Sequence, residues 1–245
     1  MNKTFYSQKI IFTYSDIDAN DNVFPSSILL AFQNIAGIHA NLLNTGYQPF
    51  IERDLIWVVD KIHFKIYKKI PYLEELTLET WPLKPSSLAV TREAIIKNAK
   101  GDILLKLSSY WCILNVKTRR LVRTKEVKEL NRDDYLDKTN FETEFFNLPA
   151  FDYTNLKETL NYQVLFTDLD HNKHMNNTNY ARLIVSSIPN IENSEVSEMQ
   201  INFSKENYKN DLLRTYVKEN SEKEYQIIGV KNNSEVSFNS YVKIK

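Results

Sequence analysis

A short polar run, FTDLDHNKHMNN (Phe166–Asn177), concentrates residue types that can move protons and stabilise charge. Asp170, Asn172 and His174 stand at alternating positions, so an extended segment would present all three side chains on one face. The imidazole and the carboxylate can orient water and transfer protons near neutral pH. The amide, with free backbone N–H groups at the start of a following helix, can stabilise a developing oxyanion. This combination favours acyl transfer.

Two other interpretations of the run stay open. His171 and His174 with Asp168 and Asp170 are ligand types that metal ions accept. The two histidines, however, are close together in a turn, and no further histidine or cysteine lies near them in the sequence. A turn rich in Asp and Asn can also simply cap a helix, because these side chains hydrogen-bond to nearby backbone. We favour catalysis over a metal site and expect no cofactor.

The polar run has a second copy early in the chain. YSDIDANDNV (Tyr14–Val23) repeats its pattern at a constant offset, with Asp16 and Asp18 at the positions of Asp168 and Asp170. We call these segments the first and second polar loops. His174 corresponds to Asn22, and His171 corresponds to an alanine. The shared residues are expected to build a turn, whereas His174 gives only the second loop a titrating group.

Each polar loop precedes a predicted helix, which is followed by predicted strands. The first helix covers Ile28–Leu43, with Pro25 where its first turn begins and Gly46 just past its end. The second helix lies in NNTNYARLIVSSIP, with Asn176 or Asn177 as its N-cap. Two-residue alternation, as in KIHFKIYK (Lys61–Lys68), predicts long antiparallel strands after the first helix. The predicted fold class is α+β, with an antiparallel sheet wrapped around a central helix in each half.

The charged and irregular residues 131–157 are predicted to link an N-terminal domain, residues 1–130, to a C-terminal domain, residues 158–245. The chain of 245 residues has zero formal net charge, which argues against a nucleic-acid binder held by bulk electrostatics. Its single cysteine, Cys112, excludes a disulfide framework and fits a reducing compartment. The N-terminus lacks a signal-peptide pattern, and no apolar run is long enough for a membrane span. We expect a cytoplasmic protein.

The motif DLDHNKHMNNTNY resembles the D-x-D-x-N-x-H-V-N-N-x-x-Y signature of the acyl-acyl-carrier-protein thioesterases of plants and bacteria, with Met175 in the usual valine place. Three other segments resemble the family in the same order: LIWVVDKIHFKIYKKIPYLEELTLETW, SSYWCILNVKTRRLVR and INFSKENYKND. The resemblance implies two tandem hotdog domains. It also implies hydrolysis of the thioester of fatty acyl-acyl carrier protein, which releases free fatty acid and ends chain elongation.

By position, Asp170, Asn172 and His174 match catalytic residues of that family, and Glu206 matches a further catalytic carboxylate. The family often has a cysteine directly after this glutamate, where this chain has Asn207. A cysteine–histidine nucleophile is therefore unsupported. We expect direct attack by water, with Glu206 or His174 as general base.

The resemblance implies an acyl carrier protein as partner and an apolar acyl pocket in the N-terminal domain, with Trp57 near it. The basic segment Lys117–Lys128, which includes Arg119 and Arg120, is a candidate docking surface. An acyl-CoA thioesterase and a non-catalytic acyl-binding hotdog protein are the alternatives. Both a monomer and a homodimer agree with the sequence. Of the remaining histidines, we expect His39 to be packed or pocket-lining and His63 to face solvent.

Overall fold

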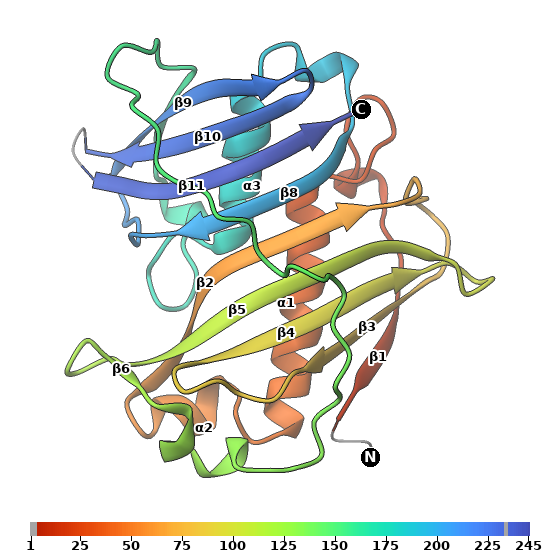
Figure 1. Ribbon diagram of the computed structural model, residues 1–245, viewed down its shortest axis with the longest axis vertical. Helices are drawn as coiled ribbons and strands as arrows, with labels where there is room; N and C mark the ends of the chain where they lie inside the picture. Colours follow the sequence, from red (N-terminus) through yellow and green to blue (C-terminus); the bar gives the residue numbers. More distant parts are fainter. Residues whose placement is uncertain (1–3, 233–234) are drawn as a thin grey trace.

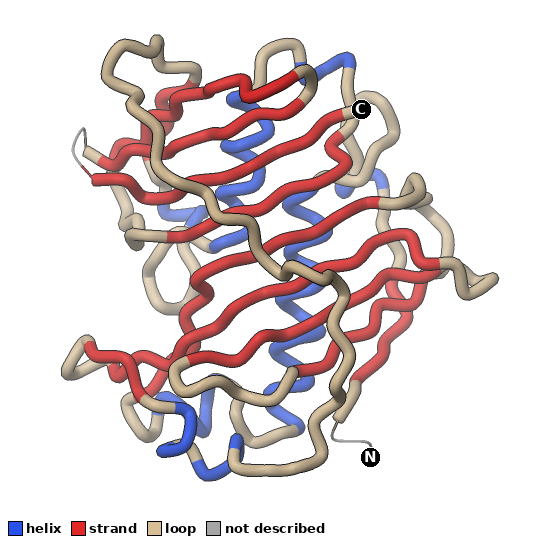
Figure 2. Tube along the Cα trace, viewed as in Figure 1, coloured by secondary structure: helices blue, strands red, loops and turns tan. Residues whose placement is uncertain are grey.

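The computed structural model describes residues 4–232 and 235–245, and its elements form two similar halves (Figures 1 and 2). The first half contains β1 (Tyr6–Ile10), α1 (Pro25–Leu42), α2 (Tyr47–Ile51), β2 (Leu55–Ile66), β3 (Leu76–Pro82), β4 (Ala89–Lys97), β5 (Ile103–Asn115) and β6 (Arg120–Val122). The second half contains β7 (Leu160–Gln163), α3 (Asn177–Ser187), β8 (Val196–Phe203), β9 (Leu212–Ser221), β10 (Glu224–Lys231) and β11 (Glu235–Ile244).

In the described ranges, the strands form one continuous 11-stranded sheet in the order β1-β3-β4-β5-β2-β8-β11-β10-β9-β7, with β6 paired to β5. All of these pairs are antiparallel, as the alternation of apolar and polar residues predicts. The halves join where β2 pairs with β8, for example at Ile62 and Ile201. This junction brings the start of β2 close to the segment that follows β8.

Helices α1 and α3 pack against each other and lie on the same face of the sheet (Figure 1). α1 begins at Pro25, whose fixed φ and missing N–H suit the first turn of a helix. α3 is capped by Asn176, whose side chain accepts a hydrogen bond from the Thr178 N–H at 3.0 Å. Phe32 of α1 and Ile184 of α3 are buried in one core shared by both halves. The fold is α+β with two tandem hotdog units, as expected.

The structure differs from two element boundaries predicted from the sequence. α1 ends at Leu42, and the Leu43 N–H is satisfied by carbonyls of the last turn. Gly46 therefore does not end α1; it precedes α2, a five-residue helix too short to show helical periodicity. β2 begins at Leu55, earlier than the alternating residues indicate, because LIWVV is apolar on both faces.

Residues 131–159 contain no helix or strand and cross the sheet on the face opposite to the helices (Figure 1). The Trp81 Nε1–H donates a hydrogen bond to the Lys138 carbonyl at 2.8 Å in the first half. The Gln226 side-chain amide donates to the Pro149 carbonyl at 2.7 Å in the second half. The segment is thus tied to both halves of the outer face.

This covering makes the expectation for His63 wrong. His63 is only 1% exposed, with Nδ1 2.9 Å from the Glu144 carbonyl and Nε2 3.0 Å from the Glu198 carboxylate. The rings of Phe141 and Phe146 pack beside it. The alternation along β2 correctly predicts which side chains share a face of the sheet. The outer face, however, is covered by residues of the segment 131–159 and not by solvent.

Among the described helices, none is both long and apolar enough to cross a membrane.

Candidate active site

The second polar loop is a tight loop, so the expectation of an extended segment is wrong. The Asp170 N–H donates to the His174 carbonyl at 2.8 Å, and the Lys173 N–H donates to the Asp170 carbonyl at 3.0 Å. Asp170 Oδ1 accepts hydrogen bonds from the N–H groups of Asn172 at 2.8 Å and His174 at 3.3 Å. Short aspartate side chains compete with secondary structure for nearby backbone in this way. The Asp170 carboxylate therefore shapes the loop that carries the other two residues.

The first polar loop has the same backbone construction. Asp18 Oδ1 accepts from the N–H groups of Asn20 at 2.8 Å and Asn22 at 2.9 Å. Equivalent isolated bridges close the two loops, Ile17–Val23 and Leu169–Met175. The predicted internal repeat and its shared turn geometry are therefore confirmed.

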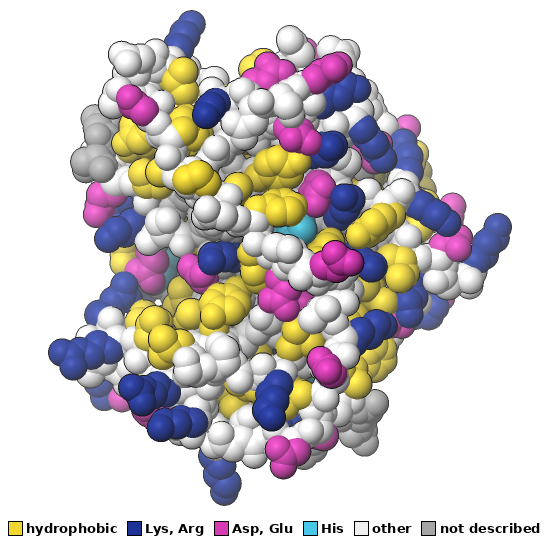
Figure 3. Space-filling model, in the orientation of Figure 1, with side chains coloured by type: hydrophobic (Ala, Val, Ile, Leu, Met, Phe, Trp, Pro, Cys, Tyr) yellow, Lys and Arg dark blue, Asp and Glu magenta, His cyan; other side chains and the backbone are white. Residues whose placement is uncertain are grey.

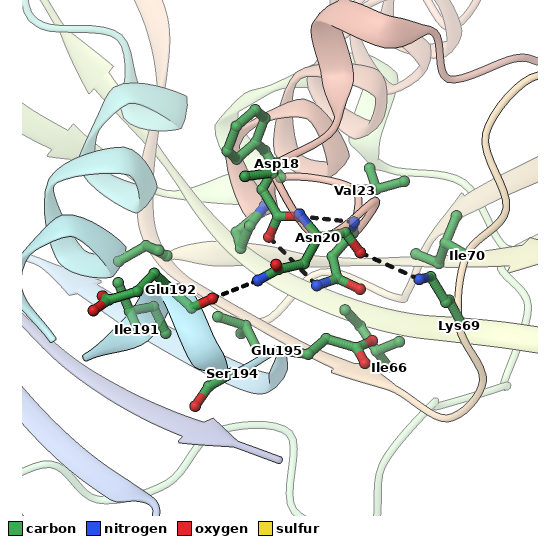
Figure 4. A pocket seen from close by; sticks show the side chains of 16 residues that line it. Asp18, Asn20, Val23, Ile66, Lys69, Ile70, Ile191, Glu192, Ser194 and Glu195 are labelled. Carbon is green, nitrogen blue, oxygen red and sulfur yellow. Dashed lines mark hydrogen bonds between the residues drawn. The ribbon is translucent and has the colours of Figure 1, made fainter. Parts of the chain in front are cut away.

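Figure 4 shows the surroundings of the first polar loop, which contacts both halves of the chain. The Asn20 side-chain amide donates to the Glu192 carbonyl at 2.6 Å, and Lys69 Nζ donates to the Asn20 carbonyl at 3.4 Å. A cavity of about 260 Å³ beside the loop has apolar walls that include Ile66 and Ile70. The first loop thus connects the two halves, and no histidine is among the described residues that line its cavity.

In the second polar loop, His174 lies beside Glu206 of the segment that follows β8. His174 Nδ1 is 3.5 Å from Glu206 Oε1. The imidazole also contacts the Tyr208 ring edge-on, with ring centroids 4.9 Å apart. The Met175 N–H donates to the Asn207 carbonyl at 2.8 Å, which fixes the loop against this segment. Two residues far apart in the sequence are thus brought together by backbone contacts between their elements.

Glu206 is held by two further side chains. Its Oε2 accepts hydrogen bonds from Arg119 Nη2 at 2.7 Å and from the Tyr208 hydroxyl at 2.9 Å. Partial burial by itself raises the pKa of Glu206, but the hydrogen bonds from Arg119 and Tyr208 and the neighbouring His174 outweigh it. The pKa of Glu206 therefore lies below its ordinary value. This carboxylate is ionised at neutral pH.

Arg119 and Tyr208 are site residues that the sequence did not indicate as such. Arg119 stands in the turn between β5 and β6 with a left-handed backbone, at φ 57°. It comes from the first half of the chain, whereas Glu206, Tyr208 and His174 come from the second. Its place in a basic run suggested docking, and no local spacing connects it to Glu206. The pairing is a product of the β2–β8 junction.

Two adjoining cavities meet at the second polar loop. The outer one, which we call the cleft, has a volume of about 280 Å³ and is lined by Asn172, His174 and Glu206. The other, which we call the inner cavity, has a volume of about 210 Å³ and lies between α1 and strands of the first half. They share these lining residues: Ile56, Trp57, Asp170, Asn172 and Asn177. Trp57 stacks on Phe50 and donates from its Nε1–H to the Thr45 carbonyl at 2.8 Å.

The surroundings of Cys112 and Asn207 do not favour either side chain as a nucleophile. Cys112 lines the cleft from β5, where burial and the Asp60 carboxylate raise the pKa of its thiol. Asn207 is fully buried, and its side-chain amide donates to the Tyr180 hydroxyl at 2.6 Å. Within residues 4–232 and 235–245, no group of three or more His, Cys, Asp or Glu side chains is arranged to hold a metal ion.

Comparison with known proteins covers both halves of the chain. Residues 3–130 match the family model of the acyl-ACP thioesterase N-terminal domain, and residues 152–243 match that of the C-terminal domain. The oleoyl-acyl carrier protein thioesterase 2, chloroplastic, of Arabidopsis thaliana is 27% identical over 85% of this chain and 61% of its own length. A palmitoyl-acyl carrier protein thioesterase of Cuphea hookeriana is 28% identical over 72% of this chain and 45% of its own length. This chain thus spans less than two thirds of these relatives.

Solved structures agree on the fold. An acyl-ACP thioesterase from Bacteroides thetaiotaomicron superposes with a TM-score of 0.90 at 19% identity, with 100% of both chains covered. The 12:0-ACP thioesterase from Umbellularia californica superposes with a TM-score of 0.87 at 17% identity, over 98% of this chain and 97% of that one. With both domain models matched in order along the chain, this protein belongs to the acyl-ACP thioesterase family.

Proposed function

We propose that this protein is an enzyme that hydrolyses the thioester of fatty acyl-acyl carrier protein and releases free fatty acid. The observation that carries the proposal is the His174–Glu206 pair, 3.5 Å apart, in a cleft that adjoins an apolar inner cavity. Family membership and the names of the plant relatives support the same reaction. The cleft would hold the thioester and the inner cavity the acyl chain.

His174 is the general base in this mechanism. Glu206 is a weak base, because Arg119 and Tyr208 occupy its Oε2 and keep its pKa low. Its Oε1 faces His174 Nδ1, so it favours the tautomer in which Nδ1 carries the proton and Nε2 has a free lone pair. His174 Nε2 then takes a proton from water as the water oxygen attacks the thioester carbonyl carbon. Glu206 stabilises the imidazolium that forms.

Asn172 and Asp170 have different roles. Asn172 lines both cavities, so its side-chain amide can donate a hydrogen bond to the carbonyl oxygen as negative charge develops there. Asp170 is a positioning residue, since its Oδ1 holds the backbone of Asn172 and His174. When the tetrahedral intermediate collapses, the carbon–sulfur bond breaks and the imidazolium proton passes to the departing thiolate. The products are a fatty acid and the free thiol of the carrier.

The acidic carrier protein would dock on basic residues near the cleft. Figure 3 shows Lys and Arg side chains gathered at the lower left, where Figure 1 places the β5–β6 hairpin. Arg119 is engaged by Glu206, so it is unsuited to the docking role expected from the sequence. Arg120 and Arg123 are exposed on the same hairpin and its continuation. We assign docking to these two residues.

The test of function is thiol release by purified protein with fatty acyl-carrier and fatty acyl-CoA substrates. Wild type is expected to cleave the carrier substrate, and His174→Ala is expected to lose this activity. Faster cleavage of acyl-CoA would favour the acyl-CoA thioesterase instead. Acyl-chain binding without cleavage of either substrate would favour the non-catalytic alternative and overturn the proposal. The cytoplasmic location and the choice between monomer and homodimer stay predictions.

Docking has its own experiment. Reversal of charge in Arg120→Glu with Arg123→Glu should raise KM for the carrier substrate more than KM for acyl-CoA, because only the carrier presents a protein surface. Lys100→Glu is the matched control, since Lys100 is exposed at the opposite end of β5, in the turn between β4 and β5. Equal changes in both KM values, or the same effect from Lys100→Glu, would remove the docking assignment.

A further inference from the structure

The inner cavity has a charged side chain in its wall, away from the second polar loop. Arg92 of β4 lines this cavity but not the cleft, and it is only 8% exposed. Its Nη1 donates hydrogen bonds to His39 Nδ1 at 3.1 Å and to Thr80 Oγ1 at 3.4 Å. His39 belongs to α1 and is packed, as expected from the sequence. Arg92 therefore points from the sheet toward α1, the side on which the cavity lies.

No carboxylate among residues 4–232 and 235–245 forms an ion pair with Arg92. Burial lowers the pKa of Arg92 to about 10, and the nearby Arg132 adds to this effect, yet the guanidinium is still charged at neutral pH. Arg132 and Glu129 also line the cavity, but Arg132 pairs with Asp134 at 2.7 Å and Glu129 with Arg53 at 3.1 Å. Of the described cations in this wall, Arg92 is the one without a carboxylate partner.

Much of the remaining wall is suited to hydrocarbon. Aromatic and aliphatic side chains line the cavity together with Arg92, namely Phe50, Ile56, Trp57, Pro82, Val90 and Trp111. A saturated acyl chain that reached Arg92 would cover a guanidinium without offering it an acceptor, which is unfavourable for a buried charge. An oxygen atom on the far part of the chain would accept a hydrogen bond from it.

We propose that Arg92 is a specificity-determining residue that selects acyl chains bearing an oxygen acceptor, such as a hydroxyl, keto or carboxylate group, toward the end remote from the thioester. The acyl chain lies along the apolar wall, and its distal oxygen replaces the missing partner of the guanidinium. The expected preference among thioester substrates rests on the proposed thioester hydrolysis. The expected binding of a chain oxygen by Arg92 does not depend on catalysis.

The first experiment compares kcat/KM for carrier-linked saturated chains and their ω-hydroxy counterparts over a series of lengths. At the length that reaches Arg92, the wild-type protein should prefer the hydroxylated chain by about ten- to a hundredfold, the range for a hydrogen bond to a charged group. Arg92→Met should lose or reverse this preference, and Arg92→Lys should keep part of it. A wild-type preference for the saturated chain at every length would overturn the proposal, whether or not the variants fold.

Val90→Ala is the matched control, because Val90 lines the same wall on the same strand without a charge. It should change the preferred length but keep the preference for oxygen. Thermal unfolding checks that Arg92→Met is folded. If the folded variant also changes only the preferred acyl-chain length, Arg92 acts as a steric stop and the proposal fails.

The second experiment measures binding of free fatty acids and ω-hydroxy fatty acids by calorimetry. Tighter binding of the hydroxy acid to wild type, but not to Arg92→Met, would support the inference even if the protein cleaves no thioester. Hydrolysis of acyl-carrier substrates without any oxygen preference in either experiment would refute the inference and leave the proposed function intact.

Discussion

His174 Nδ1 and Glu206 Oε1 lie 3.5 Å apart at the meeting point of the two halves of the chain. His174 comes from the loop before α3 and Glu206 from the segment after β8, while Arg119, which holds Glu206, comes from the first half. Formation of the β2–β8 pair is therefore a condition for assembling the site. An isolated C-terminal unit would contain His174 and Glu206 but lack Arg119, which helps to lower the pKa of Glu206.

Removal of the imidazole in His174→Ala should lower kcat by about 10²- to 10⁴-fold, the usual contribution of a general base. Acyl-chain binding should change little, because the hydrocarbon contacts lie in the inner cavity. The control is His171→Ala in the same loop. His171 packs edge-on against Tyr47 at 4.2 Å and is alanine in the first copy, so kcat should stay near the wild-type value. Steady-state hydrolysis of the carrier substrate checks both, and a larger loss in His171→Ala would contradict the assignment.

Arg119→Met should raise the pKa of Glu206, because the hydrogen bond from the guanidinium helps to hold that pKa below its ordinary value. Wild type should therefore keep Glu206 ionised to a lower pH than the variant does. NMR titration of the Glu206 side-chain carboxyl measures the difference. Arg119→Lys should restore part of the lowering, and Arg120→Met should leave the pKa of Glu206 unchanged. An unchanged pKa of Glu206 in Arg119→Met would show that this contact does not tune the carboxylate beside His174.

Asn172→Ala should lower kcat by about 10²- to 10³-fold with a smaller effect on KM, because an oxyanion donor acts on charge that develops in the transition state. Asn20→Ala is the control at the equivalent position of the first polar loop. Asn20 bonds to the Glu192 carbonyl, so its loss should reduce thermal stability and leave kcat of the folded protein intact. A KM-only effect in Asn172→Ala would indicate a role in substrate binding instead.

Much of the fold could be predicted from periodicity and repetition. The constant spacing between the two polar loops predicted the duplication, and Pro25 and Asn176 indicated where α1 and α3 begin. These features are local, so neighbouring residues encode them. The substitution of Asn22 by His174 between the copies identified the second loop as the one with a titrating side chain.

The contacts that depend on distant chain segments could not be predicted. Arg119 and Glu206 are brought together by sheet pairing, and His63 is buried by a segment that contains no regular structure. The extended form expected for Asp170–His174 was wrong because alternation describes side-chain order, not the hydrogen bonds that Asp170 makes to the loop backbone. The place of Arg92 in the cavity wall could not be predicted either, because it depends on the contact with His39 of α1, which is distant in the sequence.

Asp170 and Asp18, the equivalent aspartates of the two polar loops, allow a matched test of whether Asp170 acts by holding its loop or by taking part in the reaction. Asp170→Ala and Asp18→Ala each remove an acceptor for two backbone N–H groups, so each should lower the free energy of unfolding by roughly 1–3 kcal/mol. Only Asp170→Ala should also lower kcat of the folded protein, since its loop carries Asn172 and His174. Asp170→Asn keeps one acceptor oxygen and should retain most of the activity. Loss of activity in Asp170→Asn with unchanged stability would instead give the carboxylate a direct chemical role.

A buried carboxylate on the outer face of the sheet, Glu93 of β4, makes stability depend on pH. The Ser108 hydroxyl lies 2.8 Å from Glu93 Oε2, and the Asn140 N–H donates to the same oxygen at 3.1 Å. Burial nevertheless raises the pKa of Glu93 to about 7, because desolvation outweighs these hydrogen bonds. Asn140 belongs to the segment that crosses the outer face, so Glu93 also helps to attach that segment.

Because the pKa of Glu93 is higher in the folded chain than its ordinary 4.5, its contribution to stability is complete below about 4.5 and is lost as the pH rises through about 7. Glu93→Gln cannot ionise, and its amide can bond to both Ser108 and Asn140. The variant should therefore lose roughly 3 kcal/mol less free energy of unfolding than wild type across this range. Denaturant unfolding at several pH values measures the difference. The control, Glu75→Gln, changes an exposed carboxylate paired with Lys9 and should follow the wild-type curve. Parallel curves for Glu93→Gln and wild type would mean that the pKa of Glu93 is not raised in the folded protein.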